Sequence, residues 1–161
     1  VPHRRQRQMC IRDRFTLVPA TMQTFVVMFL GIILGYKLAT LTVILYLIEG
    51  SFGLPVFAKG GGIGYILGPT GGYLVGFIFT AFLAGHINEN KDPIIVFLYL
   101  LFSVSIIYIL GLGGLWNYMG FDKTFNDVFS VGAKPFLLIE IYKILILTVL
   151  SKQLLKMRKF T

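Results

Sequence analysis

Five long apolar runs are the feature that most limits what this chain can fold into. They are apolar at nearly every position and do not alternate between apolar and polar residues. A membrane-spanning β-strand alternates with a period of two over about ten residues, so a β-barrel is not expected. A helix that is apolar all around is typical of a membrane span or of a deeply buried core helix. We predict helices over residues 22–36, 38–48, 73–85, 93–112 and 135–155.

The scarcity of charged residues favours a membrane protein over a soluble one. Only 14% of the 161 residues are charged, against about a quarter in soluble domains. A span needs roughly 20 apolar residues, or fewer where a segment lies within a bundle. We therefore predict an all-α integral membrane protein. Its membrane-embedded domain covers 15–161, and the basic segment 1–14 is non-native or disordered.

Basic residues at the chain ends predict how the helices are oriented. Four of the last ten residues are basic, which should keep the C-terminus on the cytoplasmic side of the inner membrane. Counting back along the helices places 113–134 outside, 86–92 inside and 51–72 outside.

The five arginines within 1–14 contradict this orientation, because the first visible helix would then start outside. We expect that a native first helix is missing and that 1–14 is foreign to the protein. The alternative is that the arginines are native and the topology is inverted.

Several function classes are poorly supported by the residues present. The net charge of +8 does not indicate nucleic-acid binding, because the basic residues do not form a stripe with interleaved aromatic residues. Cys10 is the only cysteine and there are two histidines, so neither a disulfide nor a metal site is expected. No P-loop, Ser-His-Asp set or Cys-His set is visible, so we expect no catalytic residues and no ATP hydrolysis.

The segment 51–72 is the strongest candidate for ligand contact. It contains eight glycines and two prolines, clustered between helices. Glycine lets a backbone approach a ligand closely, although glycine in membrane proteins often serves helix packing alone. The candidate contacts in this segment are Gly60, Gly61, Gly62, Thr70, Gly71 and Gly72.

Glu140 and Lys143 are two charged residues in the otherwise apolar last run. They lie three apart, so they share one face of a helix. A charge near the centre of a membrane costs about 2.5–3.5 kcal/mol on insertion scales, which favours a functional role. We expect Lys143 to meet a ligand carboxylate, with Glu140 orienting Lys143 or accepting a ligand N–H. The alternative is a structural ion pair near the membrane surface.

Other side chains are weaker candidates, each with an alternative role. Gln23 could bind ligand or form a hydrogen bond across the bundle. Tyr73 and Phe57 could line a cavity. Alternatively, these two residues could be interfacial anchors, as could Trp116. Glu49 could line the same outer cavity or be solvated at a helix end.

The most distinctive motif in the chain is YLIEGSFGLPVFAKGGGIGYILGPTGGYLVGF, residues 46–77. It resembles the signature of the BioY family, the biotin-specific substrate-binding components of energy-coupling factor (ECF) transporters. VPATMQT (18–24) resembles the family's Val-Pro-x-Thr-x-Gln-Thr, and PFLLIEIYK (135–143) resembles its Pro-Phe-x-x-Gly-Asp-x-x-Lys. Glu140 stands where the family usually has Asp, and Ile139 where it has Gly.

The resemblance implies a six-helix bundle, of which five helices are visible, with a biotin cavity that opens outward. It also implies high-affinity biotin uptake with no cofactor, since biotin is the transported ligand. The expected partners are membrane lipid, a transmembrane coupling protein and ABC-type ATPases, and a homo-oligomer remains open. The alternatives are a component for another vitamin and a non-transport membrane protein, such as a scaffold or an intramembrane enzyme.

Overall fold

Helices make up nearly all regular structure in this computed structural model, as the apolar runs predict. The structure describes residues 22–57, 60–88, 90–120, 122 and 124–158, so the segment 1–14 lies outside the described residues. Within those ranges there is no strand, only one isolated bridge between Phe57 and Gly60. The helices are α2 (Gln23–Ser51), α3 (Ile63–Ile66), α4 (Gly71–Ala84), α5 (Pro93–Met119), α6 (Phe125–Gly132) and α7 (Leu137–Arg158).

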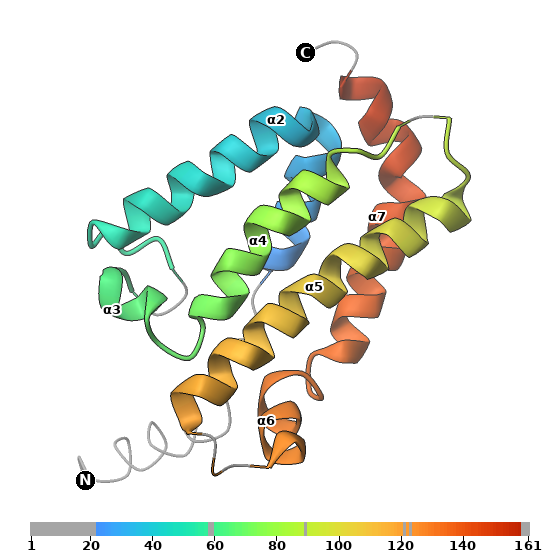
Figure 1. The fold of residues 1–161 in the computed structure, drawn as a ribbon. Coiled ribbons are helices and arrows are strands. Elements are labelled where there is room, and N and C mark those ends of the chain that lie inside the picture. The colour runs from blue at the N-terminus through green and yellow to red at the C-terminus, as the bar shows by residue number, and fades with distance from the viewer. Residues whose placement is uncertain (1–21, 58–59, 89, 121, 123, 159–161) are drawn as a thin grey trace, which may run out of the picture.

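A sharp bend at Gly35 divides α2 into two helical segments. Gly35 has φ 76° and ψ 170°, which is not a helical conformation and is one that side chains disfavour. The two segments match the separately predicted runs 22–36 and 38–48, and they run in different directions (Figure 1). Gly85 crosses next to the bend so closely that an added Cβ would lie 2.2 Å from the backbone nitrogen of Tyr36.

Close backbone approach holds α4 and α5 together along their length. A Cβ on Gly72 would lie 2.3 Å from the carbonyl oxygen of Leu110, and one on Gly76 would lie 2.8 Å from the Cα of Ile107. Small residues allow this approach, which maximises van der Waals contact between membrane helices. The buried Thr80 hydroxyl adds a hydrogen bond of 3.0 Å to the backbone carbonyl of Ser103.

Apolar side chains occupy both the interior and the exterior of the bundle. Met28, Leu100 and Leu147 are fully buried, whereas Phe102 and Val149 are more than half exposed. An apolar exterior is unfavourable in water but matches a lipid environment. Two of the described helices, α2 and α5, are long and apolar enough to cross a membrane.

The two ends of the bundle are built from different loops. The bend at Gly35, the 85–92 connection and the end of α7 meet at one end, where the Arg158 guanidinium donates to the carbonyls of Gly85 and Ile87 at 3.2 Å. The glycine-rich segment and α6 lie at the other end (Figure 1). This grouping is the one that helix counting predicts, while the cytoplasmic placement of the C-terminus stays a prediction.

Several segments differ from the sequence-based expectation, and α3 and α6 lie where no helix is predicted. The helix α5 continues to Met119, beyond the predicted end at 112, because Gly114 packs against the Cα of Gly72 and does not break the helix. The glycine-rich segment 51–72 lies at one end of the bundle (Figure 1), and only Phe57 and Thr70 are buried among the described residues 52–57 and 60–70.

The α4–α5 contact predicts a contrast between two glycine substitutions. Gly76→Ala should destabilise the fold by about 1–3 kcal/mol, because the new methyl group overpacks the contact with Ile107. Gly113→Ala should be neutral or stabilising, because nothing lies within 4 Å of its added Cβ. Thermal unfolding in detergent, followed by circular dichroism, measures both. Equal melting temperatures for the two variants would contradict this account of the packing.

Candidate ligand-binding cavity

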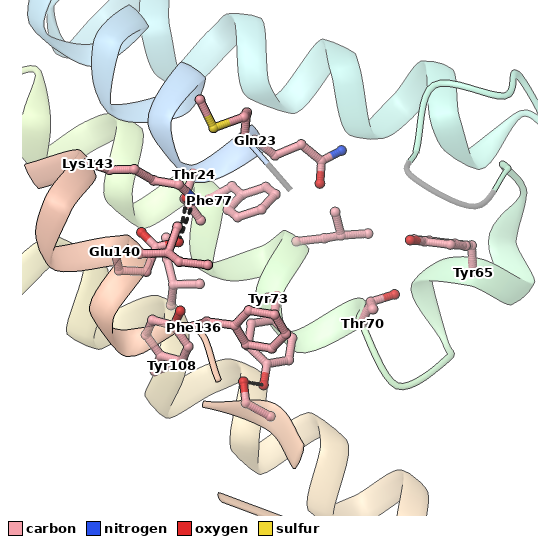
Figure 2. Close-up of a pocket in the computed structure, with 15 residues that line it drawn as sticks. Gln23, Thr24, Tyr65, Thr70, Tyr73, Phe77, Tyr108, Phe136, Glu140 and Lys143 are labelled. Atoms are coloured by element: carbon pink, nitrogen blue, oxygen red, sulfur yellow. Dashed lines mark hydrogen bonds and ion pairs between the residues drawn. The ribbon is translucent and has the colours of Figure 1, made fainter. Parts of the chain in front are cut away.

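A cavity lies between α2, α4, α5 and α7 on the side of the glycine-rich segment. Figure 2 shows Thr24, Glu140 and Lys143 gathered at one side of it, and Tyr65 and Thr70 at the opposite side. Aromatic and aliphatic side chains form the walls between these polar groups. The apolar lining residues include Leu74, Phe77, Ile107, Phe136 and Ile139.

Glu140, Lys143 and Thr24 form a compact buried cluster. Lys143 Nζ lies 2.9 Å from Glu140 Oε1 and donates to Thr24 Oγ1 at 3.0 Å. Thr24 Oγ1 in turn donates to Glu140 Oε1 at 2.8 Å. Glu140 and Lys143 are each only 5% exposed. Buried charges need this kind of mutual pairing, because the apolar interior does not solvate them.

The second carboxylate oxygen of Glu140 lacks a comparable contact. Oε2 is buried and has no hydrogen-bond partner among the described residues. Leaving a buried acceptor unsatisfied costs free energy, more for a charged group than for a neutral one. Glu140 is part of the cavity wall, so a ligand donor that reached this oxygen would satisfy it.

Two tyrosines fix the wall formed by α4 and α5. The Tyr73 hydroxyl donates to the backbone carbonyl of Gly132 at 3.0 Å, which ties α4 to the end of α6. The rings of Tyr73 and Tyr108 meet edge to face, with centroids 6.2 Å apart. The result is a rigid aromatic surface suited to the apolar part of a small ligand.

A chain of contacts attaches the glycine-rich segment to the bundle. Gln23 Nε2 donates to the Tyr46 hydroxyl at 2.7 Å, and that hydroxyl donates to the carbonyl of Val56 at 3.0 Å. Phe57 packs edge-on against Tyr46 and stacks on Tyr65, whose ring lies 5.0 Å away. These contacts hold Tyr65 at the cavity.

The structure brings together five of the eleven candidate residues from the sequence. Gln23, Thr70, Tyr73, Glu140 and Lys143 all line the cavity, although Gln23 and Lys143 are 120 positions apart in the sequence.

The other six candidates are absent from the cavity wall. Phe57 is 4% exposed and packs its ring against Gly50. Gly61, Gly71 and Gly72 approach backbone atoms of Leu54, Ile66 and Leu110 closely, so their lack of a side chain serves packing within the protein. Gly60 and Gly62 have φ of 130° and 107° in the loop before α3, a conformation that other residues rarely adopt.

Sequence reasoning did not single out several residues that the fold places on the cavity wall. Thr24 was within the motif 18–24, directly after Gln23, so its position was a usable signal. Tyr65, Tyr108 and Phe136 carried no signal that separates a cavity wall from ordinary helix packing. Glu49 is exposed and is not part of the wall, and Trp116 packs near Phe125 with ring centroids 5.9 Å apart.

Comparison with known proteins identifies this architecture. The profile of the BioY family matches residues 8–160. The chain belongs to the BioY family. Its membership accounts for the all-α bundle and for the motif around the glycine-rich segment.

Curated members of the BioY family match most of the chain. The chain is 38% identical over 138 residues to a probable biotin transporter BioY of Pyrococcus horikoshii, covering 85% of this chain and 80% of that protein. It is 38% identical over 142 residues to the biotin transporter BioY of Thermotoga maritima, covering 87% of this chain and 82% of that protein. A crystal structure of the S-component for biotin from an ECF-type ABC transporter has a TM-score of 0.76 and 26% identity, covering 88% of this chain and 78% of that one.

The buried cluster predicts different stabilities for single and double variants. Lys143→Met should destabilise the protein by about 3–5 kcal/mol, because it leaves the Glu140 carboxylate buried without its charged partner. The double variant Glu140→Gln, Lys143→Met should be more stable than Lys143→Met alone, because no buried charge remains. Thermal unfolding in detergent at neutral pH compares them. A double variant less stable than Lys143→Met would contradict this pairing argument.

Proposed function

We propose that this protein binds biotin and serves as the substrate-binding component of an ECF-type transporter that takes biotin into the cell. Family membership and the biotin-transporting relatives support the substrate. The observation that carries the proposal is the buried Glu140–Lys143 pair in the wall of an aromatic-lined cavity. Biotin joins a hydrogen-bonding ureido group to an apolar thioether ring and an acyl chain, so it needs both kinds of surface.

The ureido group of biotin fits the Glu140–Lys143 end of the cavity. A ureido group presents a carbonyl acceptor beside N–H donors, and the pair offers an ammonium donor beside a carboxylate acceptor. A ligand carboxylate at this place would lie next to the negatively charged Glu140. We therefore assign Lys143 to the ureido oxygen, in place of the ligand carboxylate expected from sequence, and Glu140 to a ureido N–H.

The rest of biotin then extends across the cavity. Its fused rings lie along Tyr73, Phe77 and Phe136, which supply the apolar surface. Its carboxylate reaches the opposite side, where the hydroxyls of Tyr65 and Thr70 can donate hydrogen bonds (Figure 2). No charged side chain is needed at that end if the carboxylate stays near the water-exposed mouth.

The ECF-type relatives indicate which partners would power uptake. The sequence has no P-loop with which to hydrolyse ATP, so any ATP hydrolysis that drives transport would come from another protein. We propose that a transmembrane coupling protein and a pair of ABC-type ATPases provide the energy. The ATPases act in the cytoplasm, so they would approach the end of the bundle that holds Arg158 and the bend at Gly35.

Purified protein in detergent or lipid should bind radiolabelled biotin, and the Glu140→Gln variant should bind it about tenfold or more weakly. The loss reflects a charge-assisted hydrogen bond, which contributes about 1.5–3 kcal/mol. Glu49→Gln is the matched control, because Glu49 is exposed and lies outside the cavity wall. Its affinity for biotin should equal that of the unsubstituted chain.

The sign of the Glu140→Gln effect also tests which end of biotin meets the pair. If the biotin carboxylate met Lys143, removing the negative charge of Glu140 would strengthen binding. If the ureido group meets the pair, binding weakens, and biotin amide loses affinity by the same factor as biotin.

No biotin binding, with tight binding of a different vitamin, would favour a related component. Binding of no vitamin would favour a non-transport membrane protein.

A further inference from the structure

Thr24 occupies an unusual position in the buried cluster, because its hydroxyl contacts both charged groups at once. It donates to Glu140 Oε1 at 2.8 Å and accepts from Lys143 Nζ at 3.0 Å. Thr24 belongs to the first turn of α2, whereas both charged residues belong to α7. Figure 2 shows the three side chains converging at one side of the cavity.

A hydroxyl suits this bridging position for a chemical reason. It has one donor and two acceptor sites, so it can satisfy a carboxylate and an ammonium simultaneously. Thr24 is only 9% exposed, so water does not readily replace these contacts. A side chain of the same shape without the hydroxyl would leave both charges with one partner fewer.

The contacts of Glu140 are strongly unequal between its two oxygens. Both Thr24 and Lys143 donate to Oε1, and Oε2 has no partner among the residues that the structure describes. Two donors on one oxygen restrict rotation of the carboxylate. The geometry therefore leaves one particular oxygen, Oε2, with its acceptor sites unfilled by the described residues.

We infer that Thr24 is a positioning residue for ligand recognition. Its hydroxyl holds the Glu140 carboxylate so that Oε2 accepts a hydrogen bond from a ligand N–H, which is a ureido N–H if the ligand is biotin. This inference rests on the proposed function and adds a residue that acts through Glu140 without touching the ligand N–H itself. It also makes recognition depend on the alignment of α2 with α7.

The test compares Thr24→Val with Thr24→Ser by equilibrium binding of radiolabelled biotin to the purified chain. Thr24→Val keeps the side-chain shape and removes the hydroxyl, so it should weaken biotin binding about ten- to a hundredfold. Thr24→Ser keeps the hydroxyl and should restore affinity to within about threefold of the unsubstituted chain. Thr148→Val is the matched control, since among the described residues the Thr148 hydroxyl donates to the backbone carbonyl of Ile144 in its own helix and to no side chain.

Two further measurements separate positioning from a general structural role. In a Glu140→Gln background, Thr24→Val should weaken biotin binding by less than about a further threefold, because the carboxylate that Thr24 positions is already gone. In the unsubstituted background, Thr24→Val should reduce the preference for biotin over an analogue methylated on both ureido nitrogens. A structural defect would weaken the binding of biotin and of the methylated analogue equally. Its effect would also add to the loss of biotin affinity caused by Glu140→Gln.

The outcomes distinguish this inference from the proposed function. An unsubstituted chain that does not bind biotin overturns the proposed function. An unsubstituted chain that binds biotin, with Thr24→Val equal to it in affinity, overturns the inference alone. Full additivity of Thr24→Val and Glu140→Gln, or an unchanged preference over the methylated analogue, also overturns the inference. A circular dichroism spectrum of Thr24→Val in detergent at the temperature of the binding assay that matches the spectrum of the unsubstituted chain shows that the binding loss is not unfolding.

Discussion

The arrangement of the cavity depends on two charges that have little access to water. An apolar bundle does not solvate Glu140 and Lys143, so each must find its partner inside the protein. They lie one turn apart on α7, and Thr24 from α2 completes their hydrogen bonding. This contact aligns the start of α2 with α7 and thereby fixes one side of the cavity. Glu140 Oε2 has no donor among the described residues, so a ligand donor is most valuable near this pair.

The remainder of the fold supplies rigidity around that cluster. Glycines at 72 and 76 bring α4 against α5 at backbone distance, which holds Tyr73 in the cavity wall. The hydrogen bond from Tyr73 to Gly132 then attaches α6 to the same wall. At the opposite end of the bundle, Arg158 joins the end of α7 to the connection between α4 and α5. The ligand-binding end and the end proposed to meet the coupling partners are therefore linked through continuous helices.

A glycine allows either a ligand or another part of the protein to approach the backbone closely, and the sequence does not distinguish these two roles. The glycines of the segment 51–72 are predicted to contact ligand, and the structure places Gly61, Gly71 and Gly72 against backbone atoms of the protein itself. A run of glycines indicates that something approaches closely, but the approaching group is chosen by the packing of distant segments. The charged pair was easier to interpret, because a charge in an apolar helix is costly wherever that helix packs. The Gly35 bend was also predictable, as a break between two apolar runs.

The sequence by itself determined the all-α membrane fold, the positions of the main helices, the family and the placement of Glu140 and Lys143 on one face of the last helix. These follow from local hydropathy, from residue spacing along a helix and from motifs that lie within single segments. Only the tertiary structure decided that Thr24, Tyr65, Tyr108 and Phe136 share one cavity with that pair. It also decided that Phe57 packs inside the protein as an anchor of the loop. The physical reason is that contacts between distant segments depend on helix rotation and crossing, which a pattern within one segment does not encode.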